Sequence, residues 1–461
     1  MDPEEFRRHG HAVVDWIAEY WRSLDARPVL SGTQPGDTRR ALPAAAPRTG
    51  ESFERILEDF DRLIMPGMSH WGHPGWFAYF PSNASPPAVL GEMLAAGVGA
   101  QCMSWITSPA ATELEQVVMS WLRELLGLPD SFTGSIQDTA SSATLLAFLT
   151  ARERAGGDLT RLTAYWSEEA HSSVAKAARL AGFSDDRCRV IPTDSNYAMD
   201  ADLLRAVMEA DARQEMIPGI VVGTMGTTSS TACDPLRAIG EHADRYAAWF
   251  HVDAAYGGTA AILPEIRPLL DGVELADSYV TNPHKWLMTS FDCSAYFVRD
   301  VPMLLRTFAV NPEYLRTTHD PEVVNFRDWG IPLGRRFRAL KLWFVLRSYG
   351  VEGLQALMRG HLAMAQEFAG WVAGAEDWEL LAPTPLGLVC CRHVPAPMRG
   401  NETALAEHNA ALLARINATG RVFLTHTMLG ERYAIRMAIG SFRSERKHVE
   451  EAWQLMEKLK S

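Results

Sequence analysis

The start of the chain repeats its apolar positions with the period of a helix. These positions are Phe6, Val13, Ile17, Tyr20 and Leu24. Residues 27–50 follow, and they are rich in the Pro, Gly and Thr that are typical of a surface linker. The apolar face of the opening helix needs a covering surface. We therefore expect residues 1–84 to form a helical segment that packs on a partner subunit, with packing on its own chain as the alternative.

From residue 85 to 350 the pattern alternates between helical stretches and short apolar runs. The runs interpreted as strands are residues 162–166, 219–224, 249–256 and 277–281. The helices between them are residues 141–156, 171–182 and 235–248, with Gly182 just past a helix C-terminus. Strands that are apolar throughout and alternate with helices predict a mostly parallel sheet covered on both faces.

After residue 350 the order of elements changes. We expect a long helix, strands at residues 386–391, 421–425 and 433–440, and a closing helix at 445–459. This order is typical of α+β architecture. The sequence thus predicts an α/β chain with a large domain at residues 85–350 and a smaller C-terminal α+β domain at 351–461.

The composition and net charge of the chain limit the kinds of binding partner that can be expected. The chain has 461 residues, a net charge of −12 and no basic stripe, which argues against nucleic acid or an anionic membrane surface. No apolar run approaches the roughly 18 residues of a spanning helix, and the charged N-terminus does not resemble a secretory signal. Six scattered cysteines without CxxC spacing are typical of reduced thiols in a cytoplasmic protein.

Two predicted strands end in residues of opposite charge. Asp253 ends the run "WFHVD", and Lys285 follows the next strand in "NPHKW". Ligands bind outside the carboxyl ends of the strands in open α/β sheets, so both side chains are expected to face one crevice. A salt bridge between them is one explanation. The other is a pyridine cofactor between them, with Asp253 on the ring nitrogen and Lys285 bonded to the aldehyde as a Schiff base.

Residues at the starts of two predicted helices are further candidates for binding a ligand. Thr139, Ala140 and Ser141 open a helix, where free N–H groups and hydroxyls can bind a phosphate, although a plain N-cap would look the same. The segment contains neither GxGxxG nor GxxxxGK[ST], so it supports neither dinucleotide nor Walker-type binding. His171 opens the following helix and could stack on a flat ring, whereas a surface histidine is the usual alternative.

Taken together, the chain resembles the group II pyridoxal-phosphate decarboxylases, and among them the aromatic-L-amino-acid decarboxylases. The resemblance spans roughly residues 1–460 and is carried by long matches: "HWGHPGWFAYFPS", "SWITSPAATELE", "IQDTAS", "EEAHSSV", "GTTSSTACDP", "HVDAAYGG", "NPHKW", "FDCSAYFV", "NPEYL" and "IPLGRRFRALKLWF". It implies the fold type I of pyridoxal-phosphate-dependent transferases, pyridoxal 5′-phosphate as cofactor, and a homodimer with shared active sites.

The resemblance also implies roles for individual residues. Lys285 would bind the cofactor aldehyde, Asp253 the ring nitrogen, and His171 would stack on the ring. The phosphate end and its surroundings would be formed by Thr139, Ala140, Ser141, Thr228, Asn282 and His284. The substrate would contact Trp71, Tyr79, Phe80, Pro81, Ser82, His171, Gly334 and, across the dimer interface, Gln101 and Met103. Ser82 stands where many relatives have Thr. Gln101 and Met103 stand where relatives usually have more apolar or aromatic groups, which leaves the substrate preference open.

Tyr314 and Gly334 bear on the reaction and the substrate. Tyr314 lies in "NPEYLRTTHDPEVVNF", a segment with two prolines and no helical period that is consistent with a mobile lid, although the residues alone favour an ordinary surface-loop tyrosine. By resemblance Tyr314 would deliver the proton that completes an amine, and relatives that form aldehydes often carry Phe there or Asn in place of His171. Gly334 resembles the residue of plant indole-accepting relatives, where a missing side chain leaves room for the wider ring.

These features predict decarboxylation of aromatic L-amino acids to arylalkylamines, with L-tryptophan favoured and phenylalanine, tyrosine and DOPA possible. The alternatives are an aldehyde synthase, another lyase or transaminase-like reaction on the same cofactor, and a binding protein without catalysis. A metal site is a further alternative, since His70 and His73 have H-x-x-H spacing. The surrounding Gly, Pro and aromatic residues supply no third ligand, so no metal is expected.

Overall fold

The computed structural model describes residues 1–310 and 312–461. The large sheet has seven strands in the order β1-β7-β6-β5-β4-β2-β3. They are β1 (Thr133–Gln137), β2 (Leu162–Ser167), β3 (Cys188–Ile191), β4 (Ile217–Thr224), β5 (Trp249–Asp253), β6 (Ser278–Thr281) and β7 (Ser294–Val298). All pairs are parallel except those of β7 with β6 and β1. The predicted mostly parallel sheet is confirmed.

Apolar side chains bury both faces of this sheet. On β4, Val221 belongs to one buried cluster, and Ile220 and Val222 belong to another. The first face is covered by α5 (Pro109–Leu126), α8 (Ala201–Arg213) and α9 (Leu236–Arg245), and the second by α6 (Ala140–Arg154), α7 (Ser172–Leu180) and α11 (Val301–Phe308). Strands with two buried faces need apolar residues at every position, which explains the missing alternation in the sequence.

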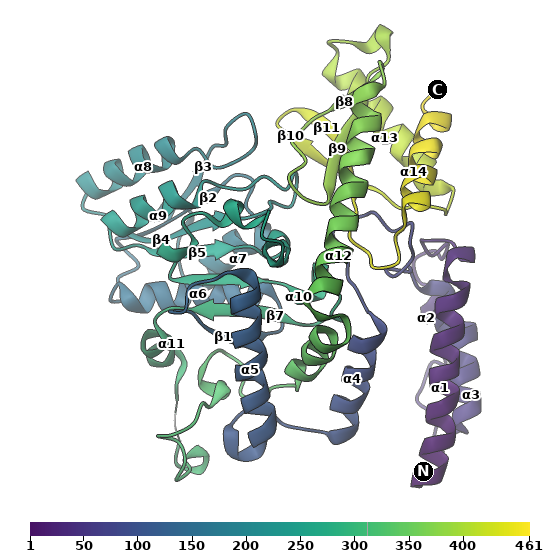
Figure 1. Cartoon of the computed structure of the whole chain (residues 1–461), viewed down its shortest axis with the longest axis horizontal. Helices are drawn as coiled ribbons and strands as arrows, with labels where there is room; N and C mark the ends of the chain where they lie inside the picture. The colour runs from purple at the N-terminus through teal and green to yellow at the C-terminus, as the bar shows by residue number, and fades with distance from the viewer. Residues whose placement is uncertain (311) are drawn as a thin grey trace.

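The C-terminal part forms a second, antiparallel sheet in the order β10-β11-β9-β8. Its elements are β8 (Trp378–Leu380), β9 (Leu388–His393), β10 (Thr425–Leu429), β11 (Arg432–Ala438), α13 (Glu402–Ala418) and α14 (Arg446–Leu459). Figure 1 shows α12 (Arg338–Gly374) running from the large domain to this small sheet. Gly350, with φ 65° and ψ 173°, interrupts the helical geometry of α12. The division at residues 350/351 stays a prediction, and α12 crosses it.

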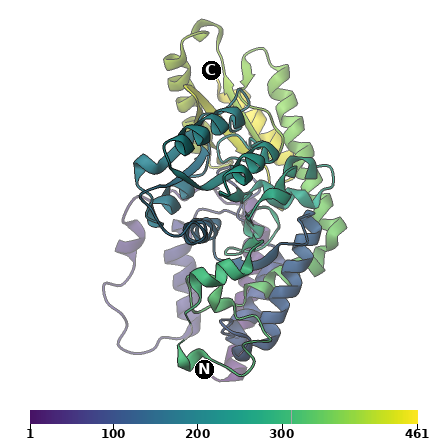
Figure 2. The same ribbon diagram turned by 90° about the vertical axis from the view of Figure 1, so that its left-hand side faces the viewer.

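The N-terminal helices are α1 (Pro3–Ser23), α2 (Asp37–Ala41) and α3 (Phe53–Asp59). They form the purple arm in Figure 1, which stands apart from the large sheet, whereas α4 (Pro86–Val98) lies next to α12. Trp16 of α1 packs its ring edge-on against Phe60, with centroids 5.1 Å apart. Figure 2 places the N-terminus and the small sheet at opposite ends of the molecule.

Some predicted boundaries were wrong. The strand expected at 421–425 lies at Thr425–Leu429, because its partner is β11, which pairs Thr425 with Arg436. Strands β1, β3 and β7 were not foreseen. β1 and β3 are the two edge strands and β7 lies next to β1, and β3 carries partly exposed residues that break the apolar pattern. Gly182 has φ +93°, as expected of a residue just past a helix.

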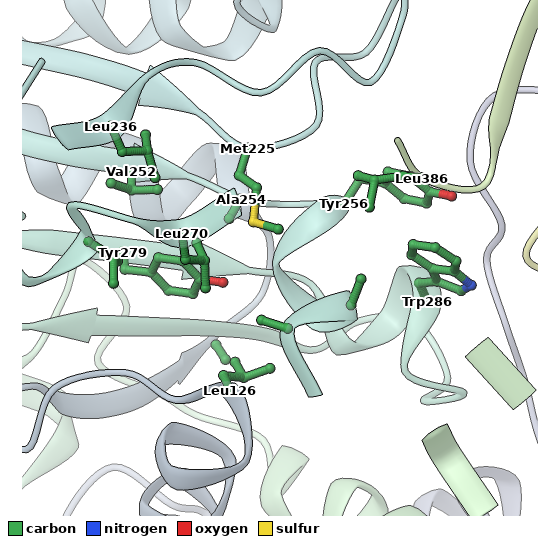
Figure 3. Close-up of a cluster of buried hydrophobic side chains, with 14 of the residues drawn as sticks. Leu126, Met225, Leu236, Val252, Ala254, Tyr256, Leu270, Tyr279, Trp286 and Leu386 are labelled. Carbon is green, nitrogen blue, oxygen red and sulfur yellow. The ribbon is translucent and has the colours of Figure 1, made fainter. Parts of the chain in front are cut away.

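The core continues from the large sheet to the small domain. Tyr256 follows β5, and its ring stacks on Trp286 with centroids 4.8 Å apart and planes 5° apart. Figure 3 shows this pair beside Leu386, which comes from the loop before β9. Trp286 belongs to the one-turn helix α10 (Pro283–Trp286), which also carries Lys285. The core therefore fixes the helix that holds the predicted nucleophile.

Candidate active site

The carboxyl ends of three neighbouring strands form one edge. Thr224 of β4 pairs in register with Asp253 of β5, which pairs with Val280 of β6. A cavity of about 210 Å³ opens there, where open α/β sheets bind ligands. It is lined by Phe80, Thr139, Ala140, Ser141, His171, Ser173, Thr224, Gly226, Thr228, Asp253, Ala255, Tyr256, Asn282, His284 and Lys285. Every residue predicted to hold the cofactor thus lines a single cavity.

Lys285 is partly buried in this cavity. Its Nζ lies 5.4 Å from the centre of the Phe80 ring, and no ion pair joins it to Asp253 in the described part of the chain. The salt-bridge explanation therefore fails for these residues. Burial lowers the pKa of Lys285, and the charge of Asp253 opposes that shift. A lowered pKa increases the fraction of neutral amine, which is the nucleophilic form.

Asp253 is 4% exposed and sits where β5 ends. Its Oδ1 accepts a hydrogen bond from the N–H of Ala255 at 3.1 Å, and it has no ion-pair partner among the described residues. A buried carboxylate without a cation is costly to desolvate. A positively charged group of a bound ligand would remove that cost.

The start of α6 offers free donors to the same cavity. Thr139 caps the helix, because its Oγ1 accepts a hydrogen bond from the N–H of Ser142 at 3.3 Å. The N–H groups of Ala140 and Ser141 have no hydrogen-bond partner in the described chain. Nearby, the buried Thr224 Oγ1 also lacks one. Unpaired donors at the positive end of a helix dipole suit a phosphate dianion.

His171 is the N-cap residue of α7. Its Nδ1 accepts a hydrogen bond from the N–H of Ser173 at 3.2 Å and lies 2.7 Å from Ser173 Oγ. Because a backbone N–H can only donate, the proton of the neutral ring resides on Nε2. Burial lowers the pKa of His171, partly offset by Asp253, which favours this neutral form.

Hydrogen bonds to neighbouring residues fix the remaining candidate cofactor-binding residues. Asn282 Oδ1 accepts a hydrogen bond from Ser294 Oγ at 2.6 Å. His284 Nδ1 accepts one from the N–H of Cys293 at 2.9 Å, and burial lowers the pKa of His284 to about 3, so its ring is neutral. The carbonyl of Thr228 accepts a hydrogen bond from Arg436 Nη2 at 2.6 Å.

Several predicted substrate residues lie outside this cavity in the single chain. Trp71 and Tyr79 stack on each other at 5.7 Å and are 42% and 52% exposed. Gly334 lies beside Gln101, because a Cβ at position 334 would be 3.1 Å from Gln101 Nε2. Tyr314 is 78% exposed, and Asn311, where its segment begins, is outside the described residues. The other predicted contacts outside the cavity are Pro81, Ser82 and Met103.

Sequence reasoning missed Thr224, Gly226, Ser173, Ala255 and Tyr256 as lining residues. Thr224 could have been found, because it ends a predicted strand as Asp253 does. Gly226, in the turn that follows β4, has φ +85°, a backbone conformation that residues with a side chain rarely adopt.

His70 and His73, the H-x-x-H pair, both have protein partners. His70 Nδ1 lies 3.0 Å from the Tyr20 hydroxyl, and His73 Nδ1 accepts a hydrogen bond from the N–H of Gly75 at 2.9 Å. His73 also lines a separate cavity of about 650 Å³ between the N-terminal segment and α14, which contains none of the predicted site residues.

Comparison with known proteins identifies the family. Residues 35–394 match the model described as the pyridoxal-dependent decarboxylase conserved domain. The chain belongs to the pyridoxal-dependent decarboxylases. Phenylacetaldehyde synthase of Arabidopsis thaliana is 43% identical, with 99% of this chain and 96% of the relative covered. Tryptophan decarboxylase 2 of Oryza sativa subsp. japonica is 42% identical, with coverages of 99% and 94%.

A solved structure supports the same family. The crystal structure of Oryza sativa TDC with PLP and tryptamine has a TM-score of 0.97 at 39% identity, covering 100% of this chain and 98% of that one. This pyridoxal-dependent decarboxylase is therefore a carboxy-lyase that uses pyridoxal phosphate. The residues fit the cofactor, because the free N–H groups of α6 suit its phosphate and the unpaired Asp253 suits its ring nitrogen. Among the described residues no helix is long and apolar enough to cross a membrane.

Proposed function

We propose that this enzyme decarboxylates aromatic L-amino acids to arylalkylamines and carbon dioxide, with L-tryptophan as the favoured substrate. One observation carries the proposal. A single cavity joins the Lys285 amine, the Asp253 carboxylate, the His171 ring and the free N–H groups at the start of α6. Phenylalanine, tyrosine and DOPA are further substrates on this proposal.

Each residue has a task in holding the cofactor. Bound pyridoxal phosphate supplies an electron-accepting ring for the electron pair that the departing carboxylate leaves behind. Lys285 binds its aldehyde, and Asp253 opposes the charge of a protonated ring nitrogen. Ala140 and Ser141 bind the phosphate through their N–H groups, assisted by Thr139, Thr228, Asn282 and His284. The ring of His171, fixed by Ser173, stacks on the cofactor.

Tyr314 completes the reaction in this proposal by giving a proton to the substrate Cα. It is exposed in the single chain, so its segment must close over a cavity before the proton is delivered. Closure also excludes water, which favours a single amine product. The chain retains both Tyr314 and His171, which supports amine formation.

The indole preference rests on Gly334. A side chain there would approach Gln101 Nε2, so glycine leaves space beside Gln101 for a bicyclic ring. The rice relative with tryptamine supports an indole substrate. The proposed substrate wall also includes Trp71, Tyr79, Phe80, Pro81, Ser82 and Met103.

A homodimer is part of the proposal. Helix α4 exposes Leu90, Met93, Leu94 and Val98, between 41% and 71% each, and α1 exposes Phe6 at 66%. A row of exposed large apolar side chains along one helix, as on α4, is typical of a subunit interface. Residues 1–84 would pack on the partner, and Gln101, Met103 and Gly334 would reach the partner's cavity. All six cysteines are free, which supports a reducing cytoplasm as the location.

A second function is supported by the phenylacetaldehyde synthase relative. Such an enzyme would consume oxygen and water and release aldehyde, carbon dioxide, ammonia and hydrogen peroxide from the amino acid. Incubating the enzyme with tryptophan, phenylalanine, tyrosine and DOPA under air separates the two, with mass spectrometry of products and an oxygen electrode. We expect amine and carbon dioxide without oxygen uptake. Stoichiometric aldehyde and peroxide would overturn the proposal.

The assignment of Lys285 has its own test. Borohydride reduction of the holoenzyme followed by peptide mapping is expected to give one pyridoxyl adduct, on the ε-nitrogen of Lys285. A label on another lysine, or none, would remove Lys285 from the mechanism.

A further inference from the structure

Asn83 connects Lys285 to the small domain. Its Nδ2 donates hydrogen bonds to the carbonyl oxygens of Lys285 at 2.7 Å and Gly440 at 3.0 Å. Its Oδ1 accepts one from the N–H of Phe442 at 3.0 Å. The side chain is 3% exposed and does not line the cofactor cavity. One carboxamide thus ties the turn that carries the lysine to the segment that follows β11.

Helix α10 needs such a partner. It has only four residues, Pro283–Trp286, and a helix leaves its last carbonyl groups without intrahelical donors. Asn83 satisfies the carbonyl of Lys285, and Ser85 Oγ donates to the carbonyl of Met288 at 2.6 Å. The residues 83–85 therefore fix the main chain on which the Lys285 side chain is mounted.

We infer that Asn83 is a positioning residue for Lys285. It holds the main chain from which the amine extends, and so sets where Nζ lies relative to the Asp253 carboxylate. A buried amide with both N–H donors and its oxygen engaged is held in place, because breaking one of these bonds leaves a polar group unpaired at about 1–3 kcal/mol. The inference rests on the proposed role of Lys285.

Two substitutions test it. Asn83→Ala removes both donors. Asn83→Asp keeps the shape and the acceptor for the Phe442 N–H, but sets an oxygen against the carbonyls of Lys285 and Gly440. For each variant we would measure the dissociation constant of pyridoxal phosphate from the apoenzyme, the visible circular dichroism of the bound cofactor, and the pH midpoint of its absorbance. Loss of the Lys285 contact is expected to weaken cofactor binding about tenfold, to reduce the dichroism and to move the midpoint.

Asn409 is a matched control. It is also a fully buried Asn with three hydrogen bonds: Nδ2 donates to the carbonyls of His393 at 2.9 Å and Leu405 at 2.8 Å, and Oδ1 accepts from the N–H of His393 at 2.8 Å. It lies on α13, in the small domain. Asn409→Ala and Asn409→Asp are expected to lower the melting temperature without changing the cofactor dissociation constant or the pH midpoint.

The outcomes separate the two claims. If the Asn83 variants behave as the Asn409 variants do, losing thermal stability with cofactor binding within twofold and an unmoved midpoint, Asn83 is only structural and the inference is wrong. Should Asn83→Ala not fold, the isosteric Asn83→Asp gives the same decision. Absence of a pyridoxyl label on Lys285 in the wild-type enzyme would instead overturn the proposed function.

Discussion

Arg436 donates a hydrogen bond from Nη2 to the carbonyl oxygen of Thr228 over 2.6 Å, and one from Nε to the carbonyl of Ser229 over 3.1 Å. Arg436 belongs to β11 of the small sheet, whereas Thr228 lies in the turn after β4 and lines the cofactor cavity. The Arg436 guanidinium is 5.5 Å from the centre of the Phe80 ring, and the Lys285 amine is 5.4 Å from the centre of the same ring. The small domain therefore holds two walls of the cavity.

Arg436→Lys is expected to weaken pyridoxal phosphate binding about tenfold. A lysine keeps the charge but cannot reproduce the fork of donors that spans two carbonyl groups. Fluorescence titration of the apoenzyme measures the change. Arg392→Lys is the control, because Arg392 is equally buried on the neighbouring β9 but pairs with Glu379 and Glu402. Equal effects of the two substitutions would show that Arg436 acts only through general stability.

The lowered pKa of Lys285 predicts a pH dependence of apoenzyme stability. Between the lowered folded-state pKa and the ordinary value of 10.5, the unfolded chain binds more protons than the folded chain at this residue. The contribution of Lys285 to the free energy of unfolding therefore rises with pH across that window. Below the window the amine is charged in both states, and the full cost of burying that charge applies. The free energy of unfolding, measured with denaturant at increasing pH, should rise less steeply for the Lys285→Met apoenzyme than for the wild-type apoenzyme. Parallel curves would contradict the shift.

Under air, Tyr314→Phe is expected to lower the amine yield and to consume oxygen and water, releasing aldehyde, ammonia and hydrogen peroxide, since no other proton donor is assigned to the substrate Cα. A positioned proton donor contributes roughly 10²–10⁴-fold in rate, so amine formation should slow by that order. Product analysis by mass spectrometry is the measurement. An unchanged amine yield with no aldehyde would exclude Tyr314.

Gly334→Ser is expected to lower kcat/KM for tryptophan relative to tyrosine by about 10–100-fold, because the new side chain fills space beside Gln101. Gly360→Ser is the control, since a Cβ at position 360 of α12 meets nothing within 4 Å. The ratio of the two kcat/KM values is compared among the three enzymes. A ratio that does not move would refute the indole assignment.

Leu94→Glu is expected to dissociate the proposed dimer and to abolish activity, because it places a charge in the exposed apolar row of α4. Sedimentation velocity gives the oligomeric state. Leu180→Glu on α7, which is 64% exposed and outside that row, should leave it unchanged. A wild-type enzyme that is monomeric and active would disprove the shared site.

The sequence predicted the parallel core, which is confirmed, and it named the cofactor candidates that the structure brings to one cavity. Asp253 and Lys285 could be paired in advance because each follows an apolar run, and the ends of parallel strands share an edge. The start of α6 was visible from its hydroxyl and small residues. The ends of the strands were harder to predict, since the position of β10 is set by its register with β11 and not by its own residues.

What the sequence by itself determined are local properties: which runs are buried on two faces, where helices start, and which side chains follow strand ends. Only the tertiary structure showed that Asn83 supports Lys285 and that Arg436 supports Thr228, partners that lie 202 and 208 positions apart. Neither residue carries a local signal, because a hydrogen bond to a backbone carbonyl depends on where the chain passes and not on the identity of the residue it reaches.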